Sequence, residues 1–147
     1  MTQPQFDPSI KQKVQDIIDL SKETLGSNLG MEFISAAPDK LVARMPVDKR
    51  TKQPFGLLHG GASVALAESL ASTGAWLNVD EKKYFVVGQE INANHIRSLD
   101  SGYVIGTSVP LHIGRSSQVW ETKIHAEDTG KLICVSRCTL AVVERKP

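Results

Sequence analysis

Residues 60–79, GGASVALAESLASTGAWLNV, form the stretch that decides the expected fold. Small or apolar side chains occupy every face of a helix drawn through this stretch, so we predict a helix that is largely buried. Glu68 and the hydroxyl side chains of the stretch would be too costly in a bilayer, which excludes a membrane-spanning helix. We therefore expect a central helix in the core of a globular domain.

Several runs with the composition of β-strands lie around this helix. In the run 118–126, apolar or small side chains alternate with polar ones, as in an antiparallel strand with one buried face. Turn-forming residues such as Asp-Ser-Gly at 100–102 separate most of the runs. One helix and about six strands predict an α+β fold, in which an antiparallel sheet wraps around the helix. The runs are Met31–Ala36, Lys40–Pro46, Tyr84–Ile96, Tyr103–Ile113, Gln118–Ala126 and Lys131–Val143.

A further helix is predicted ahead of the sheet, over residues 8–25. Asp7 followed by Pro8 offers an N-cap and a proline at the first helical position, and Gly26 marks the end. We expect residues 1–28 to be an N-terminal helical segment. The apolar residues of this helix recur at helical spacing: Ile10, Val14, Ile17, Ile18 and Leu25.

The composition is ordinary for one globular domain. The chain has 147 residues, of which 41% are hydrophobic and 22% are charged, so we expect a single domain over residues 1–147. The formal net charge of +1 gives no overall attraction to nucleic acid or to an anionic membrane, and we expect neither partner. Any anionic ligand must therefore be bound by a local cluster of donors.

Cys134 and Cys138 are four positions apart in a strand-like run, so a separation of roughly 13 Å is too long for a disulfide. We expect two buried thiols, since the histidines and cysteines lack zinc-ligand spacing, and we expect no metal and no resident cofactor. The N-terminus lacks a basic region followed by an apolar run, so we expect no signal peptide. Reduced cysteines then agree with a cytoplasmic protein.

Glu68 is the only formally charged side chain between Lys52 and Asp80. Burial of a lone carboxylate disfavours its charged form, and this is useful in a general base or a carboxylate nucleophile. The alternative is a carboxylate satisfied by a hydroxyl, such as that of Ser72 one helical turn further along.

The helix begins at His59-Gly60-Gly61. The first N–H groups of a helix lack internal partners and lie at its positive end, and glycines leave them open to a ligand. Such groups can stabilise the oxyanion of an acyl-transfer reaction. The alternative is that the glycine pair only allows a tight entry into the helix.

The run QPFGLLHGGASVALAES, residues 53–69, resembles the active-site segment of hotdog-fold thioesterases of the phenylacetate and 4-hydroxybenzoyl-CoA type. The runs VVGQEINANHIRS, residues 86–98, and PLHIGRSSQVW, residues 110–120, are most similar to one branch of that family. The branch comprises bacterial 1,4-dihydroxy-2-naphthoyl-CoA hydrolases of menaquinone synthesis and thioesterases that proofread siderophore synthesis. The resemblance implies a hotdog fold and hydrolysis of an acyl-CoA, with an aromatic acyl group, to a carboxylic acid and coenzyme A.

The resemblance also implies roles for individual residues. Glu68 would act as the nucleophile or as the general base for water, and both roles stay open. The Gly60 N–H would donate to the thioester oxygen, while Gln53 and His59 would position the thioester. Ser72 would orient the attacking water or the carboxylate.

A second implied group of residues would line a channel for coenzyme A. Arg97 and Arg115, with neighbouring serines, would supply phosphate donors to an otherwise neutral protein, although without the resemblance solvated turn residues are the simpler interpretation of both. His95 and His112 are likewise compatible with ordinary strand ends. The implied channel residues are Gly88, His95, Ile96, Arg97, Ser98, His112, Ile113, Gly114, Arg115, Ser116 and Ser117.

The spacing of Gly60 and Glu68 bears on the oligomeric state. Eight positions along a helix place their Cα atoms roughly 12 Å apart, so one carbonyl is hard to reach from both. This favours a homodimer in which the helix start of one subunit faces the glutamate of the other, as the resemblance implies. The resemblance also implies that dimers pair into a homotetramer.

Two other functions and the acyl group stay open. A hotdog hydratase or dehydratase places a catalytic histidine well before the helix, where VDKRTKQPF, residues 47–55, has none. A non-catalytic acyl-CoA binding protein would have little use for the carboxylate of Glu68. The apolar side chains that are compatible with either an acyl pocket or ordinary core are Phe55, Leu57, Leu58 and Trp76.

Overall fold

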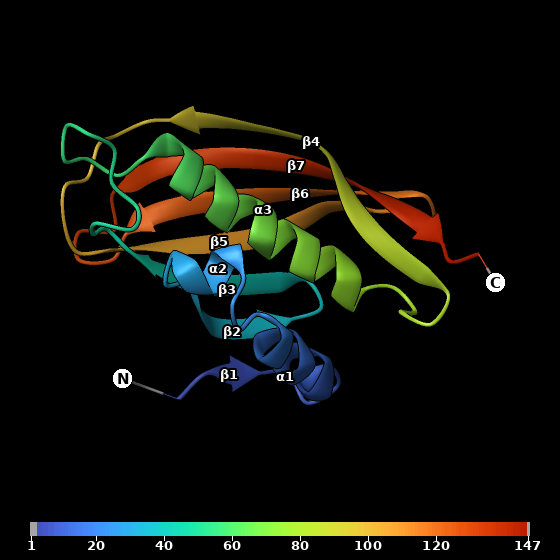
Figure 1. The fold of residues 1–147 in the computed structure, drawn as a ribbon. Helices are drawn as coiled ribbons and strands as arrows, with labels where there is room; N and C mark the ends of the chain where they lie inside the picture. Colours follow the sequence, from blue (N-terminus) through green and yellow to red (C-terminus); the bar gives the residue numbers. More distant parts are fainter. Residues whose placement is uncertain (1–2, 147) are drawn as a thin grey trace.

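The computed structural model describes residues 3–146, so residues 1–2 and 147 of the predicted domain lie outside the described part. One long helix lies against a single seven-stranded sheet (Figure 1). None of the helices described over residues 3–146 is long and apolar enough to cross a bilayer. The elements are β1 (Gln5–Phe6), α1 (Lys11–Leu20), α2 (Leu25–Asn28), β2 (Glu32–Ala37), β3 (Lys40–Pro46), α3 (Gly60–Leu77), β4 (Tyr84–His95), β5 (Tyr103–Ile113), β6 (Ser117–Ala126) and β7 (Leu132–Glu144).

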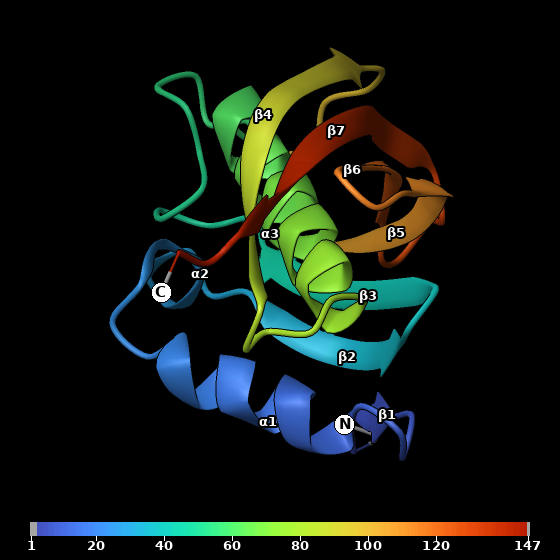
Figure 2. The same ribbon diagram turned by 90° about the vertical axis from the view of Figure 1, so that its right-hand side faces the viewer.

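The sheet has the strand order β1-β2-β3-β5-β6-β7-β4. Among the strands described over residues 3–146, only the pair of β1 with β2 is parallel, and every other neighbouring pair is antiparallel. Figure 2 shows the sheet curving around α3 from β2 to β4, while α1 and α2 lie beyond β2 and beside the helix. The prediction of an antiparallel sheet wrapped around one central helix is therefore confirmed.

The predicted strands agree with the observed ones within one residue at each end. In β6, the inward side chains Trp120, Thr122 and Ile124 are at most 1% exposed, as the alternation predicts. The two-residue strand β1 was not predicted, because a segment this short has no period to detect. The central helix ends at Leu77, two residues before the predicted end, and the Asn78 amide group donates to the carbonyl oxygen of Gly74 at 2.8 Å.

The predicted N-terminal helix over residues 8–25 is wrong at both ends. Asp7 accepts from the N–H of Ser9 at 2.8 Å and closes a turn, so α1 begins only at Lys11. The helix ends at Leu20, and Glu23 follows with a φ of 66°, a left-handed conformation that a helix cannot continue through. Leu25 therefore begins the separate helix α2, where it is 62% exposed instead of belonging to the α1 stripe.

The core lies between α3 and the middle of the sheet. Ala71 is completely buried, and a methyl group added to Gly74 would come within 2.6 Å of the Trp120 ring. The missing side chain thus lets the indole of β6 pack directly on the helix. Cys134 and Cys138 of β7 are free and buried, as predicted.

Candidate active site

The start of α3 is organised by His59. Its Nδ1 accepts a hydrogen bond of 2.8 Å from the N–H of Gly61, which caps the helix. Because Nδ1 is an acceptor, a neutral His59 imidazole carries its proton on Nε2. The N–H of Gly60 has no acceptor among residues 3–146. The positive end of α3 therefore presents one open backbone donor, as an oxyanion site requires.

His95 lies at the end of β4 and is close to Gly60. A methyl group placed on Gly60 would lie only 2.8 Å from His95 Nε2, so the imidazole rests directly on the glycine. The family resemblance implied a coenzyme A channel for His95 and the oxyanion site for Gly60. The structure brings the two residues into contact.

Glu68 lies two helical turns further along α3. Its side chain is partly buried and lines a cavity. The prediction of a buried carboxylate is therefore wrong. A side chain at Gly88 of β4 would collide with Glu68 Oε1, so this glycine makes room for the carboxylate. Burial, with smaller effects of the Glu68 and Glu90 carboxylates, raises the pKa of Cys138 to about 11.

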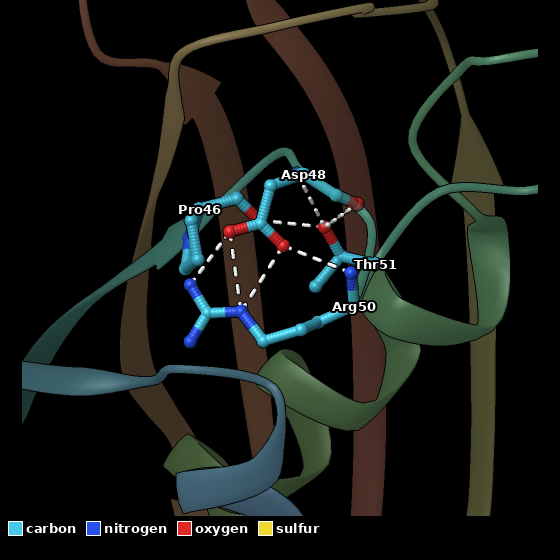
Figure 3. Close-up of polar contacts among 4 residues, drawn as sticks. All are labelled: Pro46, Asp48, Arg50 and Thr51. Carbon is cyan, nitrogen blue, oxygen red and sulfur yellow. Dashed lines mark hydrogen bonds and ion pairs between the residues drawn. The ribbon is translucent and has the colours of Figure 1, made fainter.

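The loop between β3 and α3 is held by a compact polar turn (Figure 3). Asp48 accepts from the backbone N–H of Arg50 at 2.9 Å and from its guanidinium at 2.6 Å. Thr51 is buried and donates to the carbonyl oxygen of Pro46 at 2.7 Å. This turn fixes the direction in which the chain leaves β3 and enters the loop that carries His59. No role was predicted for Asp48, Arg50 and Thr51, although an aspartate that accepts from the backbone two residues later is a known turn signal.

Gln53 lies in the same loop, eight residues before Gly61. The side-chain oxygen of Gln53 accepts from the backbone N–H of Phe55, and the backbone N–H of Gln53 donates to the carbonyl oxygen of Leu57 at 2.8 Å. The carboxamide nitrogen of Gln53 has no acceptor within the described residues and stays available to a ligand. Phe55 itself is 90% exposed, so it contributes nothing to the core.

A cavity of about 1190 Å³ runs along the side of α3 that faces α1 and α2. It is open to Glu68 and to Ser72, which share this face of the helix. Within residues 3–146, no hydrogen bond joins Ser72 to Glu68, although the spacing allowed one. The candidate pocket residues Phe55, Leu57, Leu58 and Trp76 do not line the cavity; its apolar wall comes from Ile17, Ile18, Leu25, Met31 and Phe33, which sequence analysis did not place in a pocket.

Apart from Gly88, which lies beside Glu68, the implied coenzyme A residues fall into two groups, in which Gly114 and Ser117 are half-buried and the others are exposed. Ile96 and Arg97 follow β4, where the Arg97 guanidinium donates to the carbonyl oxygen of Leu132 at 3.0 Å. The second group forms the turn between β5 and β6, where the His112 imidazole lies against Gly114. The remaining residues of the second group, Ile113, Arg115, Ser116 and Ser117, lie in or beside the same turn. In the described part of the chain, no cluster of three His, Cys, Asp or Glu side chains is suited to a metal ion.

The chain is similar to several known proteins. Residues 55–133 match the family described as the thioesterase superfamily. The 1,4-dihydroxy-2-naphthoyl-CoA hydrolase of Escherichia coli (strain K12) is 52% identical over 115 residues, covering 78% of this chain and 83% of that protein. The proofreading thioesterase EntH of Cronobacter turicensis is 50% identical over 120 residues, covering 82% of this chain and 86% of that protein.

A solved structure of a mutant thioesterase PA1618 from Pseudomonas aeruginosa has a TM-score of 0.86 and 46% sequence identity, covering 89% of this chain and 94% of that one. The chain therefore belongs to the thioesterase superfamily. It has the hotdog fold and is a thioester hydrolase. The resemblance to naphthoyl-CoA hydrolases and proofreading thioesterases is thereby confirmed.

Proposed function

We propose that this chain hydrolyses an aromatic acyl-CoA, such as 1,4-dihydroxy-2-naphthoyl-CoA, to the free acid and coenzyme A. The observation that carries the proposal is the placement of two groups on α3. Glu68 opens on a cavity, and the N–H of Gly60 at the positive helix end has no acceptor among residues 3–146. The names of the similar hydrolases and proofreading thioesterases support this substrate class.

In the proposed reaction, Glu68 either attacks the thioester carbon or removes a proton from the attacking water. The carbonyl oxygen becomes an oxyanion, which the N–H of Gly60 from the second subunit of the homodimer proposed below stabilises. Collapse of this intermediate breaks the C–S bond and releases the coenzyme A thiolate, which takes up a proton. If Glu68 is the nucleophile, water then hydrolyses the acyl anhydride. Either route needs only water as co-reactant.

Three neighbouring side chains would position the reactants. His59 donates from Nε2 because Nδ1 is occupied by the Gly61 N–H, and Gln53 offers its free carboxamide nitrogen. Ser72 would orient the water or the carboxylate from the cavity wall. Arg97 and Arg115 would bind the phosphates of coenzyme A, which forms part of the substrate, so no separate cofactor is proposed.

We also propose that the active site is completed in a homodimer. Gly60 and Glu68 are separated by eight positions, or roughly 12 Å along the axis of α3, so the two groups cannot readily serve one carbonyl. β4 carries Gly88 next to Glu68, and in the described chain this strand pairs only with β7. A second subunit at the free edge of β4 would bring its own helix start near Glu68. Pairing of two dimers would give the proposed homotetramer.

The decisive experiment measures thiol release from benzoyl-, hydroxynaphthoyl-, hexanoyl- and palmitoyl-CoA. Glu68→Gln keeps the size of the side chain and removes its basicity, so kcat should fall by about a hundredfold or more. The matched control is Glu121→Gln, a glutamate of β6 that is paired with Arg137 and does not line the cavity. Circular dichroism checks that both variants are folded.

Two outcomes would contradict the proposal. Unchanged turnover in folded Glu68→Gln would remove the glutamate from the reaction. A wild-type protein that binds coenzyme A but releases no thiol from any thioester would be a non-catalytic binding protein. Sedimentation with simultaneous activity measurement tests the dimer, because a fully active monomer would show that one subunit is sufficient.

A further inference from the structure

We infer that α1 and α2, residues 11–28, form one wall of the acyl-binding site and determine which acyl groups the enzyme accepts. The enzyme accepts acyl groups with an apolar end longer than a pair of aromatic rings. We call residues 11–28 the N-terminal roof. The inference rests on the proposed function, because it takes Glu68 as the point where the thioester carbon is bound. It adds the position and the chemistry of the far end of the acyl group.

The size of the cavity is the first argument. Its volume of about 1190 Å³ lies above the range of roughly 300–1,000 Å³ that is usual for small-molecule sites. Glu68 of α3 lies on one wall, and Ile17, Ile18 and Leu25 of the N-terminal roof lie on another. The space that begins at the proposed catalytic carboxylate therefore continues to the roof, beyond the needs of a bicyclic aromatic group.

The polarity of the walls is the second argument. Near Glu68 the cavity is lined by Ser69 and Ser72, whose hydroxyls donate to no other group within residues 3–146. The roof contributes the apolar side chains of Ile17, Ile18 and Leu25, together with the polar residues Ser21, Lys22, Thr24 and Ser27. Leu25 is 62% exposed. An acyl group with its carbonyl at Glu68 would thus reach the apolar side chains of Ile17, Ile18 and Leu25 at its far end. Each further methylene group buried at that apolar end should raise the affinity.

The attachment of the roof is the third argument, because only a fixed wall can select by size. The Lys13 ammonium group is 2.6 Å from Glu81 Oε2, donates to the carbonyl oxygen of Val79 at 3.0 Å, and lies 5.2 Å from the centre of the Trp76 ring. Val14 on the same helix is completely buried in the core. These contacts therefore attach the roof near the C-terminal end of α3. The next turn of α1, which carries Ile17 and Ile18, faces the cavity.

The test uses binding and not turnover. S-alkyl-CoA thioethers with four, eight and twelve carbons cannot be hydrolysed, and S-(naphthylmethyl)-CoA serves as the bicyclic probe. In the wild-type protein, affinity should rise with chain length through the twelve-carbon probe. Ile17→Trp fills the far end, so affinity for that probe should fall by about tenfold or more, whereas the four-carbon and bicyclic probes should change less than about twofold.

Two further variants keep the test decisive. Leu25→Trp fills the cavity from α2 at an exposed position, so it should fold even if Ile17→Trp does not, and it should show the same loss. Leu20→Trp is the matched control, because Leu20 is 73% exposed on α1 and does not line the cavity. This control should bind every probe like the wild-type protein.

The failures of the two proposals are distinguishable. If thioethers bind but affinity is the same at every chain length, or if Ile17→Trp and Leu25→Trp bind like Leu20→Trp, the inference fails and the proposed function stands. If no thioether binds and no acyl-CoA releases thiol, the proposed function fails, and the inference fails with it.

Discussion

The two sides of α3 are packed in opposite ways, although they belong to one helix. On the side of β6, the small residues Ala71 and Gly74 let the fully buried Trp120 lie directly against the helix. On the side of the N-terminal roof, a cavity of about 1190 Å³ separates Glu68 from Ile17. The difference shows how one helix can be held rigidly by the sheet and still offer binding space along its other side.

The largest expected effect comes from breaking the packed side. Trp120→Ala removes a side chain with no exposed surface, so the free energy of unfolding should fall by about 3–5 kcal/mol. Val64→Ala changes a partly buried residue of the cavity wall and should cost about 1 kcal/mol or less. Urea unfolding measures both values. Equal losses would contradict the contrast between the two sides.

A smaller effect, on activity and not on stability, is expected at Gly88. A methyl group there meets only the mobile end of the Glu68 side chain, so the fold should tolerate Gly88→Ala while the carboxylate is displaced. Displacement of a reacting group by about 1 Å can cost up to about a hundredfold, so we expect kcat to fall at least about tenfold. Gln89→Ala, at the neighbouring exposed position, is the control. Unchanged activity in Gly88→Ala would mean that this position of the carboxylate is not the reactive one.

The sheet side could be predicted from the sequence, whereas the cavity side could not. Alternation in 118–126 reports directly which side chains face α3, because a strand has a fixed period of two. The cavity depends on where α1 ends and α2 begins, and the left-handed conformation of Glu23 between them is not revealed by the composition. Ile17 and Ile18 therefore look like ordinary core residues in the sequence, while the structure places them beside Glu68 across a cavity.

The site shows the same division between local and distant information. His59-Gly60-Gly61 could be recognised because helix capping and the open donors belong to consecutive residues. The contact of His95 with Gly60 joins two elements that are far apart in the chain, and no local pattern indicates it. Glu68 was predicted to be buried, and this prediction failed. The number of apolar neighbours in the sequence does not show which of them turn away from the helix.

The next prediction concerns the attachment of the N-terminal roof. Lys13→Met removes the hydrogen bond to Val79 and the ion pair with Glu81, whose carboxyl pKa Lys13 holds below its usual value. Because Val14 still packs in the core, the loss of global stability should be much smaller than for Trp120→Ala. Limited proteolysis within residues 11–28 should nevertheless become faster. Lys11→Met, at an exposed position of α1, should be cleaved like the wild-type protein.

The smallest effect is expected at the polar turn that precedes α3, and it should depend on pH. Hydrogen bonds from the side chain and the backbone of Arg50 lower the pKa of Asp48 from its usual 3.8 to about 2. Because the pKa is lower in the folded state, the charged carboxylate stabilises the protein above its usual pKa, and this contribution is lost as the pH falls toward about 2.

Asp48→Asn keeps an acceptor for the N–H of Arg50 but carries no charge. Its stability relative to the wild-type protein should therefore be slightly lower at neutral pH and should approach the wild-type value in acid. Urea unfolding at about pH 7 and about pH 3 measures the difference. A difference that stays constant between the two conditions would show that the turn holds the loop through geometry alone, and that the charge of Asp48 contributes nothing to the rigid side of the molecule.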